Sequence, residues 1–123
     1  MIARNLGMED VLVESAQVTF DEFKKLDMRV GTVVNVEQVK RTERLYKIQV
    51  DLGEIGVRQT VSSLVGYYTP DELKGKKIIY LVNLKPAKFS GEMSEGMLLA
   101  AEKGEKLALL CTDKEMENGA RVT

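Results

Sequence analysis

From Met28 onward, apolar and polar residues alternate with a period of two, which restricts the chain to a fold built from half-buried β-strands. The clearest example is the run RLYKIQVDL at positions 44–52. There the period predicts an inward face made of Tyr46, Ile48, Val50 and Leu52, and an outward face made of Lys47, Gln49 and Asp51. In the preceding run, MRVGTVVNVEQVK, it predicts an inward face of Val30, Thr32, Val34 and Val36, and an outward face of Arg29, Asn35 and Glu37. Antiparallel strands with one covered face have this pattern.

Three further stretches have strand or hairpin signals. GEIG at 53–56 predicts a turn, and a third strand follows through Val57–Ser63. The run KKIIYLVNL at 76–84 is almost continuously apolar after its lysines, so we expect it to be the most buried strand. Near the C-terminus, GMLLAA and KLALLCT flank EKGEK, whose glycine predicts the turn of a hairpin.

Two short segments have helix signals instead. In TFDEFKKLD, Thr19 and Glu22 are spaced as a capping box. The apolar face predicted for this helix consists of Phe20, Phe23 and Leu26. In TPDEL, Thr69 is a suitable N-cap and Pro70 stands at the first helical position, which predicts a short helix between the third and fourth strands.

Together these elements predict an all-β fold, a five-stranded barrel of the OB type. A short helix precedes the barrel, another lies between strands 3 and 4, and a hairpin follows at the C-terminal end. A chain of 123 residues suits one domain, which we place at residues 19–123. Residues 1–18 have no clear period, and we interpret them as an N-terminal extension that is loosely held or packs late.

The absence of histidine and the single cysteine, Cys111, limit the chemistry. The usual proton shuttle at neutral pH and the usual zinc ligand are missing, and one cysteine cannot form an internal disulfide or a structural zinc site. Ser-His-Asp and Cys-His nucleophiles are excluded as normally built, whereas enzymes that rest on carboxylates or lysine stay open. We therefore expect no metal site and no cofactor, and we expect Cys111 to pack within its apolar run, LALLC.

The net charge of −1 conceals an uneven distribution. From Lys40 to Lys88 there are ten basic residues against five acidic ones, so this segment carries +5 and the remainder −6. A local positive field attracts a polyanion even when the total charge is negative. No apolar run approaches the roughly 20 residues of a membrane span, and the N-terminus lacks the cationic start and apolar core of a signal peptide. We therefore expect a cytoplasmic protein with no membrane partner.

The first candidate site is the junction of the first two strands, which carries Lys40, Arg41 and Arg44. OB-folds use this loop to hold nucleic acid, and lysine and arginine bind phosphates with release of counterions. The alternative is a solvated hairpin tip, which this stretch taken alone favours.

The second candidate site is NLKPAKFSGEMSEGMLLAA at 83–101, interpreted as a loop with Lys85 and Lys88. Phe89 and Met93 offer stacking or apolar contacts, and the glycines around Ser94 let a ligand approach the backbone closely. An ordinary loop that needs glycine for its turns is an equal alternative. The carboxylates that flank the serine, Glu92 and Glu95, would repel phosphate unless they point away. The neighbouring pair Tyr67 and Tyr68 could stack on bases, but packing against the barrel is favoured.

Five stretches resemble, in order, the tRNA-binding domain family: LDMRVGTVVNVE, KRTERLYKIQVDLGE, LVGYYTPDELKGKKI, VNLKPAKFSGEMSEGMLLAA and NGARV. The likeness runs from about Phe20 to the C-terminus. The family includes the C-terminal domain of many methionyl-tRNA synthetases, free-standing homodimeric tRNA-binding proteins and the C-terminal domain of a cytokine released from multisynthetase complexes. The chain looks most like the free-standing beta subunit of archaeal methionyl-tRNA synthetase.

The resemblance implies an OB-fold that recognises the shape of folded tRNA, not an anticodon sequence. Arg44 matches the family's basic residue before Leu-Tyr, and the Ser-x-Gly-Met motif of the tRNA-contacting face is present. The tRNA-binding residues predicted in this way are Lys40, Arg41, Arg44, Lys85, Lys88, Ser94 and Met97. Many bacterial members have His-Pro-Asn-Ala-Asp before the basic-Leu-Tyr segment, whereas this chain has KRTE, which removes two hydrogen-bonding side chains and adds positive charge.

The resemblance also implies a homodimer that does not aminoacylate, because the synthetase active-site motifs are absent from the sequence. Such a protein would act in trans for methionyl-tRNA synthetase, whose catalytic subunit is then a candidate partner. A related branch, the CsaA-type chaperones, shares the barrel and is associated with unfolded polypeptide. DLGEIGVRQ fits that branch as well, whereas LKPAKFSG with SEGMLLAA fits the tRNA branch better. A plain structural or interaction subunit is the third class.

Overall fold

A computed structural model of the chain describes residues 16–123. Most of the predicted extension at 1–18 therefore lies outside the described residues. The elements are α2 (Phe20–Lys24), β1 (Met28–Gln38), β2 (Tyr46–Asp51), the 3-10 helix η1 (Gly53–Ile55), β3 (Val57–Ser62), α3 (Pro70–Leu73), β4 (Lys77–Leu81), β5 (Ala87–Phe89), β6 (Glu92–Ser94), β7 (Met97–Leu98), β8 (Ala100–Lys103), β9 (Lys106–Leu109) and β10 (Arg121–Val122).

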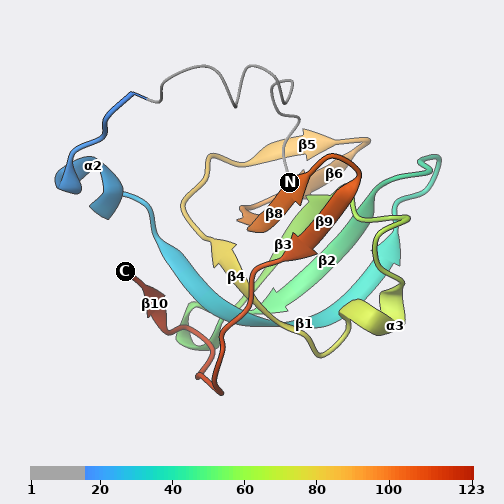
Figure 1. The fold of residues 1–123 in the computed structure, drawn as a ribbon. Helices are drawn as coiled ribbons and strands as arrows, with labels where there is room; N and C mark the ends of the chain where they lie inside the picture. Colours follow the sequence, from blue (N-terminus) through green and yellow to red (C-terminus); the bar gives the residue numbers. More distant parts are fainter. Residues whose placement is uncertain (1–15) are drawn as a thin grey trace.

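Five strands form the barrel, in the order β3-β2-β1-β4-β7, and β10 pairs with β1 (Figure 1). All of these pairings are antiparallel. The two open ends of the sheet approach each other, since the Thr60 hydroxyl on β3 donates to the carbonyl of Gly96, just before β7, at 3.0 Å. Two further hairpins, β5–β6 and β8–β9, form small sheets of their own. The prediction of an all-β, OB-type barrel with short helices is confirmed.

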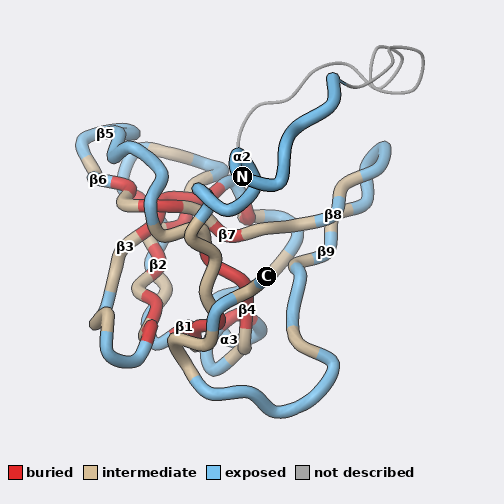
Figure 2. Tube along the Cα trace, turned by 90° about the vertical axis from the view of Figure 1, so that its left-hand side faces the viewer, coloured by how far each residue is buried: buried red, intermediate tan, exposed pale blue. Residues whose placement is uncertain are grey.

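The buried residues gather in the middle of the barrel (Figure 2), and the hydrophobic ones form one continuous cluster. Its buried core consists of Val33, Tyr46, Ile48, Val50, Leu52, Leu64, Leu73, Ile78, Tyr80 and Leu98. The inward face predicted for β2 is confirmed at all four positions, and β4 is buried at its three central residues. Burying this much apolar surface is the main stabilising contribution to such a fold.

The inward face predicted for β1 is wrong in part, because the strand contains a β-bulge. Its pairing with β2 shifts between Val33 and Asn35, so Val34 has no partner across the ladder. Val33 is 1% exposed and lies in the core, whereas Val34 is 40% exposed. Thr32, also predicted inward, sends its hydroxyl to Asn118 Oδ1 in the C-terminal segment at 2.8 Å. A bulge adds one residue to one strand and therefore reverses the alternation on either side of it.

Both predicted helices form: α2 has the predicted capping box, and α3 has the predicted N-cap Thr69, which also forms a capping box with Glu72. In α3, Leu73 is fully buried and closes one end of the barrel. All five residues of α2 are exposed, and Phe20 is exposed by 71%.

The prediction that Cys111 packs is wrong, because its thiol lies on the exposed segment after β9.

Candidate nucleic-acid interface

The loop between β1 and β2 presents Lys40, Arg41 and Arg44 as exposed side chains. Its backbone is held by a compact turn, since Thr42 donates to the Val39 carbonyl through both its amide (3.2 Å) and its hydroxyl (2.8 Å). Arg41 adopts a positive φ of 66°, a conformation that non-glycine residues rarely take. The loop is therefore an ordered turn with its cations directed to solvent.

The segment with Lys85 and Lys88 was predicted to be a loop, but it contains a hairpin. Lys88 lies on β5 opposite Met93 on β6, and Phe89 pairs with Glu92. The two turn residues, Ser90 and Gly91, both have positive φ values of 50° and 83°. This is the backbone of a two-residue turn of type I′, whose twist matches that of the flanking strands. Lys85 lies two residues before β5, and both lysines are exposed.

The predicted contact residue Ser94 is buried and faces the barrel. Its Oγ accepts a hydrogen bond from the Val61 amide at 3.0 Å and donates to the Gly96 carbonyl at 3.1 Å. The hydroxyl therefore ties the base of the β5–β6 hairpin to β3, and it is not among the groups that face solvent. Met97, the other residue of the motif, is half-buried on β7 and pairs with Leu81.

The surroundings of Gly96 explain why the same motif has a glycine at this position. Its φ is 132°, and a Cβ added there would come within 2.4 Å of the Leu81 carbonyl oxygen and 2.6 Å of the Tyr80 ring. The Tyr80 hydroxyl donates to the Glu95 carbonyl at 2.8 Å. Burial raises the pKa of the Tyr80 phenol well above its usual range, so it stays a protonated donor. The glycine thus lets the chain cross directly over the buried tyrosine.

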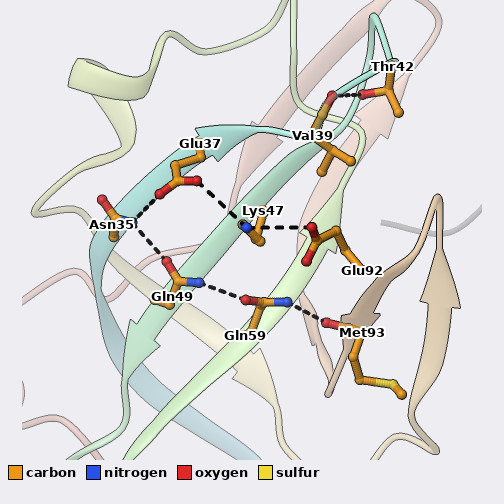
Figure 3. A network of polar contacts seen from close by, with 9 residues as sticks. All are labelled: Asn35, Glu37, Val39, Thr42, Lys47, Gln49, Gln59, Glu92 and Met93. Carbon is orange, nitrogen blue, oxygen red and sulfur yellow. Dashed lines mark hydrogen bonds and ion pairs between the residues drawn. The ribbon is translucent and has the colours of Figure 1, made fainter.

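The two basic segments lie at the same end of the molecule. Lys47, three residues after Arg44, pairs with Glu92, which follows the Ser90–Gly91 turn, at 3.5 Å (Figure 3). This contact places the start of β6 beside β2, and Lys88 lies on the same hairpin, opposite Met93. Lys85 lies two residues before β5.

Sequence comparison identifies the family. A family model described as a putative tRNA-binding domain matches residues 28–121. The chain belongs to this tRNA-binding domain family. The match covers the five barrel strands and both basic segments, and it ends at the first residue of β10.

Relatives of this tRNA-binding domain are methionine–tRNA ligases. The chain is 44% identical to that of Archaeoglobus fulgidus over 99% of its own length, and 50% identical to that of Thermococcus kodakarensis over 85%. It spans only 18% and 14% of those two proteins.

The described residues, 16–123, include no helix that is long and apolar enough to cross a membrane.

Solved structures support both branches of the resemblance. A MetRS-related protein from Pyrococcus horikoshii superposes with a TM-score of 0.82 at 44% identity, covering 89% of this chain and all of that one. The chaperone CsaA from Bacillus anthracis gives 0.80 at 29% identity, covering 88% of this chain and all of that one. The fold is thus shared by proteins described in two different ways.

The outer face of β1, β2 and β3 in this tRNA-binding domain has a polar surface that the sequence motifs did not single out (Figure 3). Gln49 Nε2 donates to Gln59 Oε1 at 2.7 Å, and Gln59 Nε2 donates to the Met93 carbonyl at 2.8 Å. The sequence signal for Gln49 was its outward position in the alternation. The carboxylates on either side of Ser94, expected to repel phosphate, both have partners on this face. Glu92 pairs with Lys47, and Glu95 Oε1 accepts from the backbone amide of Gln59 at 3.2 Å.

Proposed function

We propose that this protein is a non-catalytic tRNA-binding protein that recognises folded tRNA by shape and acts in trans for a methionyl-tRNA synthetase. The observation that carries the proposal is the grouping of the β1–β2 loop and the β5–β6 hairpin at one end of a tRNA-binding domain. The proposed contacts are Lys40, Arg41, Arg44, Lys85 and Lys88, with Ser94 and Met97 holding the hairpin base in place. We take residues 19–123 as the binding unit and the cytoplasm as its location.

Exposed cations on two separate segments suit a phosphate backbone better than a base sequence. Each phosphate contact releases counterions, so affinity should fall steeply as salt rises. A-form RNA is read through its shape, its phosphates and its 2′-hydroxyls, which makes binding largely indifferent to base identity.

Similarity to methionine–tRNA ligases and to a MetRS-related protein supports the proposed trans-acting role. Methionine–tRNA ligases contain a segment similar to this chain over less than a fifth of their length. The match to the Pyrococcus horikoshii structure described as MetRS-related covers all of that chain and 89% of this one. A synthetase catalytic subunit is therefore the proposed protein partner.

A homodimer is proposed from the exposed face of α2. Phe20, Phe23 and Leu26 line a groove of about 320 Å³ with Val122 of β10. The charged residues that line this groove are Lys24 and Arg121. An apolar patch that meets its own copy across a two-fold axis satisfies the requirement that both subunits use the same surface. Two copies would also bind one RNA with higher avidity.

The test is a titration of the purified protein against total tRNA and against a duplex RNA of equal length, at two salt concentrations. We expect tighter binding to tRNA, with an affinity that falls steeply with salt. Equal affinity for both RNAs would contradict recognition of tRNA shape, and no binding at low salt would contradict the function itself. Sedimentation of the same sample tests the homodimer.

A second candidate function is the binding of unfolded polypeptide. The observation that favours it is the pair of exposed apolar side chains on the β5–β6 hairpin, Phe89 and Met93, in a chain similar to CsaA chaperones. Suppression of the aggregation of a denatured client, without affinity for RNA, would favour this function over tRNA binding.

A further inference from the structure

A closed ring of polar contacts joins the β5–β6 hairpin to the outer face of the barrel (Figure 3). One arm of the ring runs from Asn35 through Gln49 and Gln59 to the Met93 carbonyl. The other arm runs from Asn35 through Glu37 and Lys47 to Glu92, which is adjacent to Met93 on β6. The hairpin is thus connected to β1 by two separate routes.

The hydrogen bonds of the amide arm have one direction only. The Met93 carbonyl can only accept, so the Gln59 amide nitrogen faces it and the Gln59 oxygen faces Gln49. Gln49 must then donate to Gln59 and accept from Asn35, whose nitrogen is 3.1 Å from the Gln49 oxygen and 3.3 Å from Glu37. The Met93 carbonyl at one end and the Glu37 carboxylate that accepts from Asn35 at the other can only accept, so the orientation of every amide between them is determined.

The charged arm is centred on Lys47. Its ammonium lies 3.7 Å from Glu37 Oε2 and 3.5 Å from Glu92 Oε2. The Lys47 side chain is 24% exposed, whereas those of Glu37 and Glu92 are 59% and 35% exposed. An approaching phosphate would therefore meet the two carboxylates before the ammonium. Unneutralised, these carboxylates would repel it from the surface between the two basic segments.

We propose that Lys47 is a positioning residue of the RNA site and not one of its phosphate contacts. Its single positive charge faces both Glu37 and Glu92, so it offsets half of their negative charge and ties β6 to β1. The cations that contact phosphate are then those of the β1–β2 loop and the hairpin arm, held at a defined separation. The role of Lys47 in RNA binding rests on the proposed function, whereas its ion pair with Glu92 on β6 does not.

The experiment compares Lys47→Met in two backgrounds, the natural chain and a Glu37→Gln/Glu92→Gln variant. Affinity for tRNA and its dependence on salt are measured for all four proteins. Lys114→Met, a change of an exposed lysine between β9 and β10, is the control for losing one charge anywhere on the chain. The β9–β10 segment lies on the side of the barrel away from β5 (Figure 1).

In the natural chain we expect Lys47→Met to lower tRNA affinity roughly tenfold, because it leaves two carboxylates unpaired beside the RNA. In the double-glutamine background we expect the same substitution to change affinity no more than Lys114→Met does, with an unchanged salt slope. A clear loss in that background, with a salt slope shallower by about 0.7 to 0.9, would identify a phosphate contact and overturn the proposal. Equal affinity with and without Lys47 in the natural chain would also overturn it.

Amide hydrogen exchange separates this proposal from the proposed function. If the unmodified protein binds no RNA, the function fails, but the tie to β6 can still be measured. Lys47→Met should speed exchange of the β5–β6 amides and leave the β8–β9 amides unchanged. Unchanged exchange in β5–β6 would overturn the positioning role, and a thermal unfolding curve shows that the variant remains folded.

Discussion

The two small hairpins of this molecule, β5–β6 and β8–β9, leave the barrel in different ways. In β8–β9, exposure alternates along both strands, and Leu107 and Leu109 pack against the core. In β5 all three residues are exposed, and the arm is joined to the barrel largely by polar side chains. One hairpin extends the core, whereas the other is held outside it.

The difference indicates which hairpin is free to serve a ligand. Residues that bury apolar surface are constrained by stability, so β8–β9 has little freedom to change. Polar attachments contribute less stability each, but they determine geometry. We infer that β5–β6 exists to present Lys85, Lys88 and Phe89 at the interface. The following substitutions test that comparison, beginning with the largest expected effect.

Gly96→Ala should be the most damaging change, because it affects the base of the β5–β6 arm. The new Cβ would lie 2.4 Å from the Leu81 carbonyl oxygen and 2.6 Å from the Tyr80 ring, at a φ of 132°. Backbone strain and overpacking together should cost about 3 kcal/mol or more of unfolding free energy, measured by urea denaturation. Gly104→Ala in the β8–β9 turn is the matched control. Its φ is 61° and the added Cβ meets open space among the described residues, so about 1 kcal/mol is expected. If both variants lost a similar unfolding free energy, the close contacts around Gly96 would not matter and only its positive φ would require glycine.

Leu109→Ala and Phe89→Ala compare the two hairpins directly. Leu109 packs against the core, so its truncation should lower the unfolding free energy by about 2 kcal/mol. Phe89 is 47% exposed, and its truncation should cost less than about 0.5 kcal/mol. Denaturation curves give both values. If Phe89→Ala proved as costly as Leu109→Ala, the distinction between the hairpins would be wrong.

Ser94→Ala should cost about 1.5 kcal/mol, because the Val61 amide loses its buried acceptor. Its effect on tRNA affinity should be small while the protein is folded. Ser62→Ala is the control: Ser62 Oγ is buried on β3 with no hydrogen-bond partner in the described part of the chain, so its removal should be neutral or slightly stabilising. A large loss of affinity at full stability would instead make the Ser94 hydroxyl a direct contact.

Much of the barrel could be predicted because its strands have a uniform period. The alternation from Tyr46 to Leu52 predicted the correct face at every position. On β1 the same reasoning failed at Thr32 and Val34, because the bulge depends on pairing with β2, which the strand's own residues do not specify. Local capping signals at Thr19 and Thr69 were sufficient for both helices.

The site was less predictable, because its geometry depends on contacts between distant residues. The basic positions could be found from charge, but nothing local to Ser94 indicates that its hydroxyl turns toward Val61. The hairpin turn at Ser90–Gly91 did have a sequence signal, a two-residue turn with glycine, which the reading of this segment as a loop overlooked. The ring joins residues as far apart in sequence as Lys47 and Glu92, which are 45 positions apart and beyond the reach of any periodicity.

The most direct measurement compares two lysine pairs, one on β5 and the residues just before it, the other on β8–β9. Lys85→Ala/Lys88→Ala and Lys103→Ala/Lys106→Ala remove the same charge from exposed positions. Affinity for tRNA is measured over a range of salt concentrations. We predict that the first variant loses about tenfold in affinity and has a salt slope shallower by about 1.5, because two phosphate contacts are lost, whereas the second binds nearly as the natural chain does. Equal losses in both variants, or no loss in the first, would contradict the claim that β5–β6 is the arm that holds the RNA.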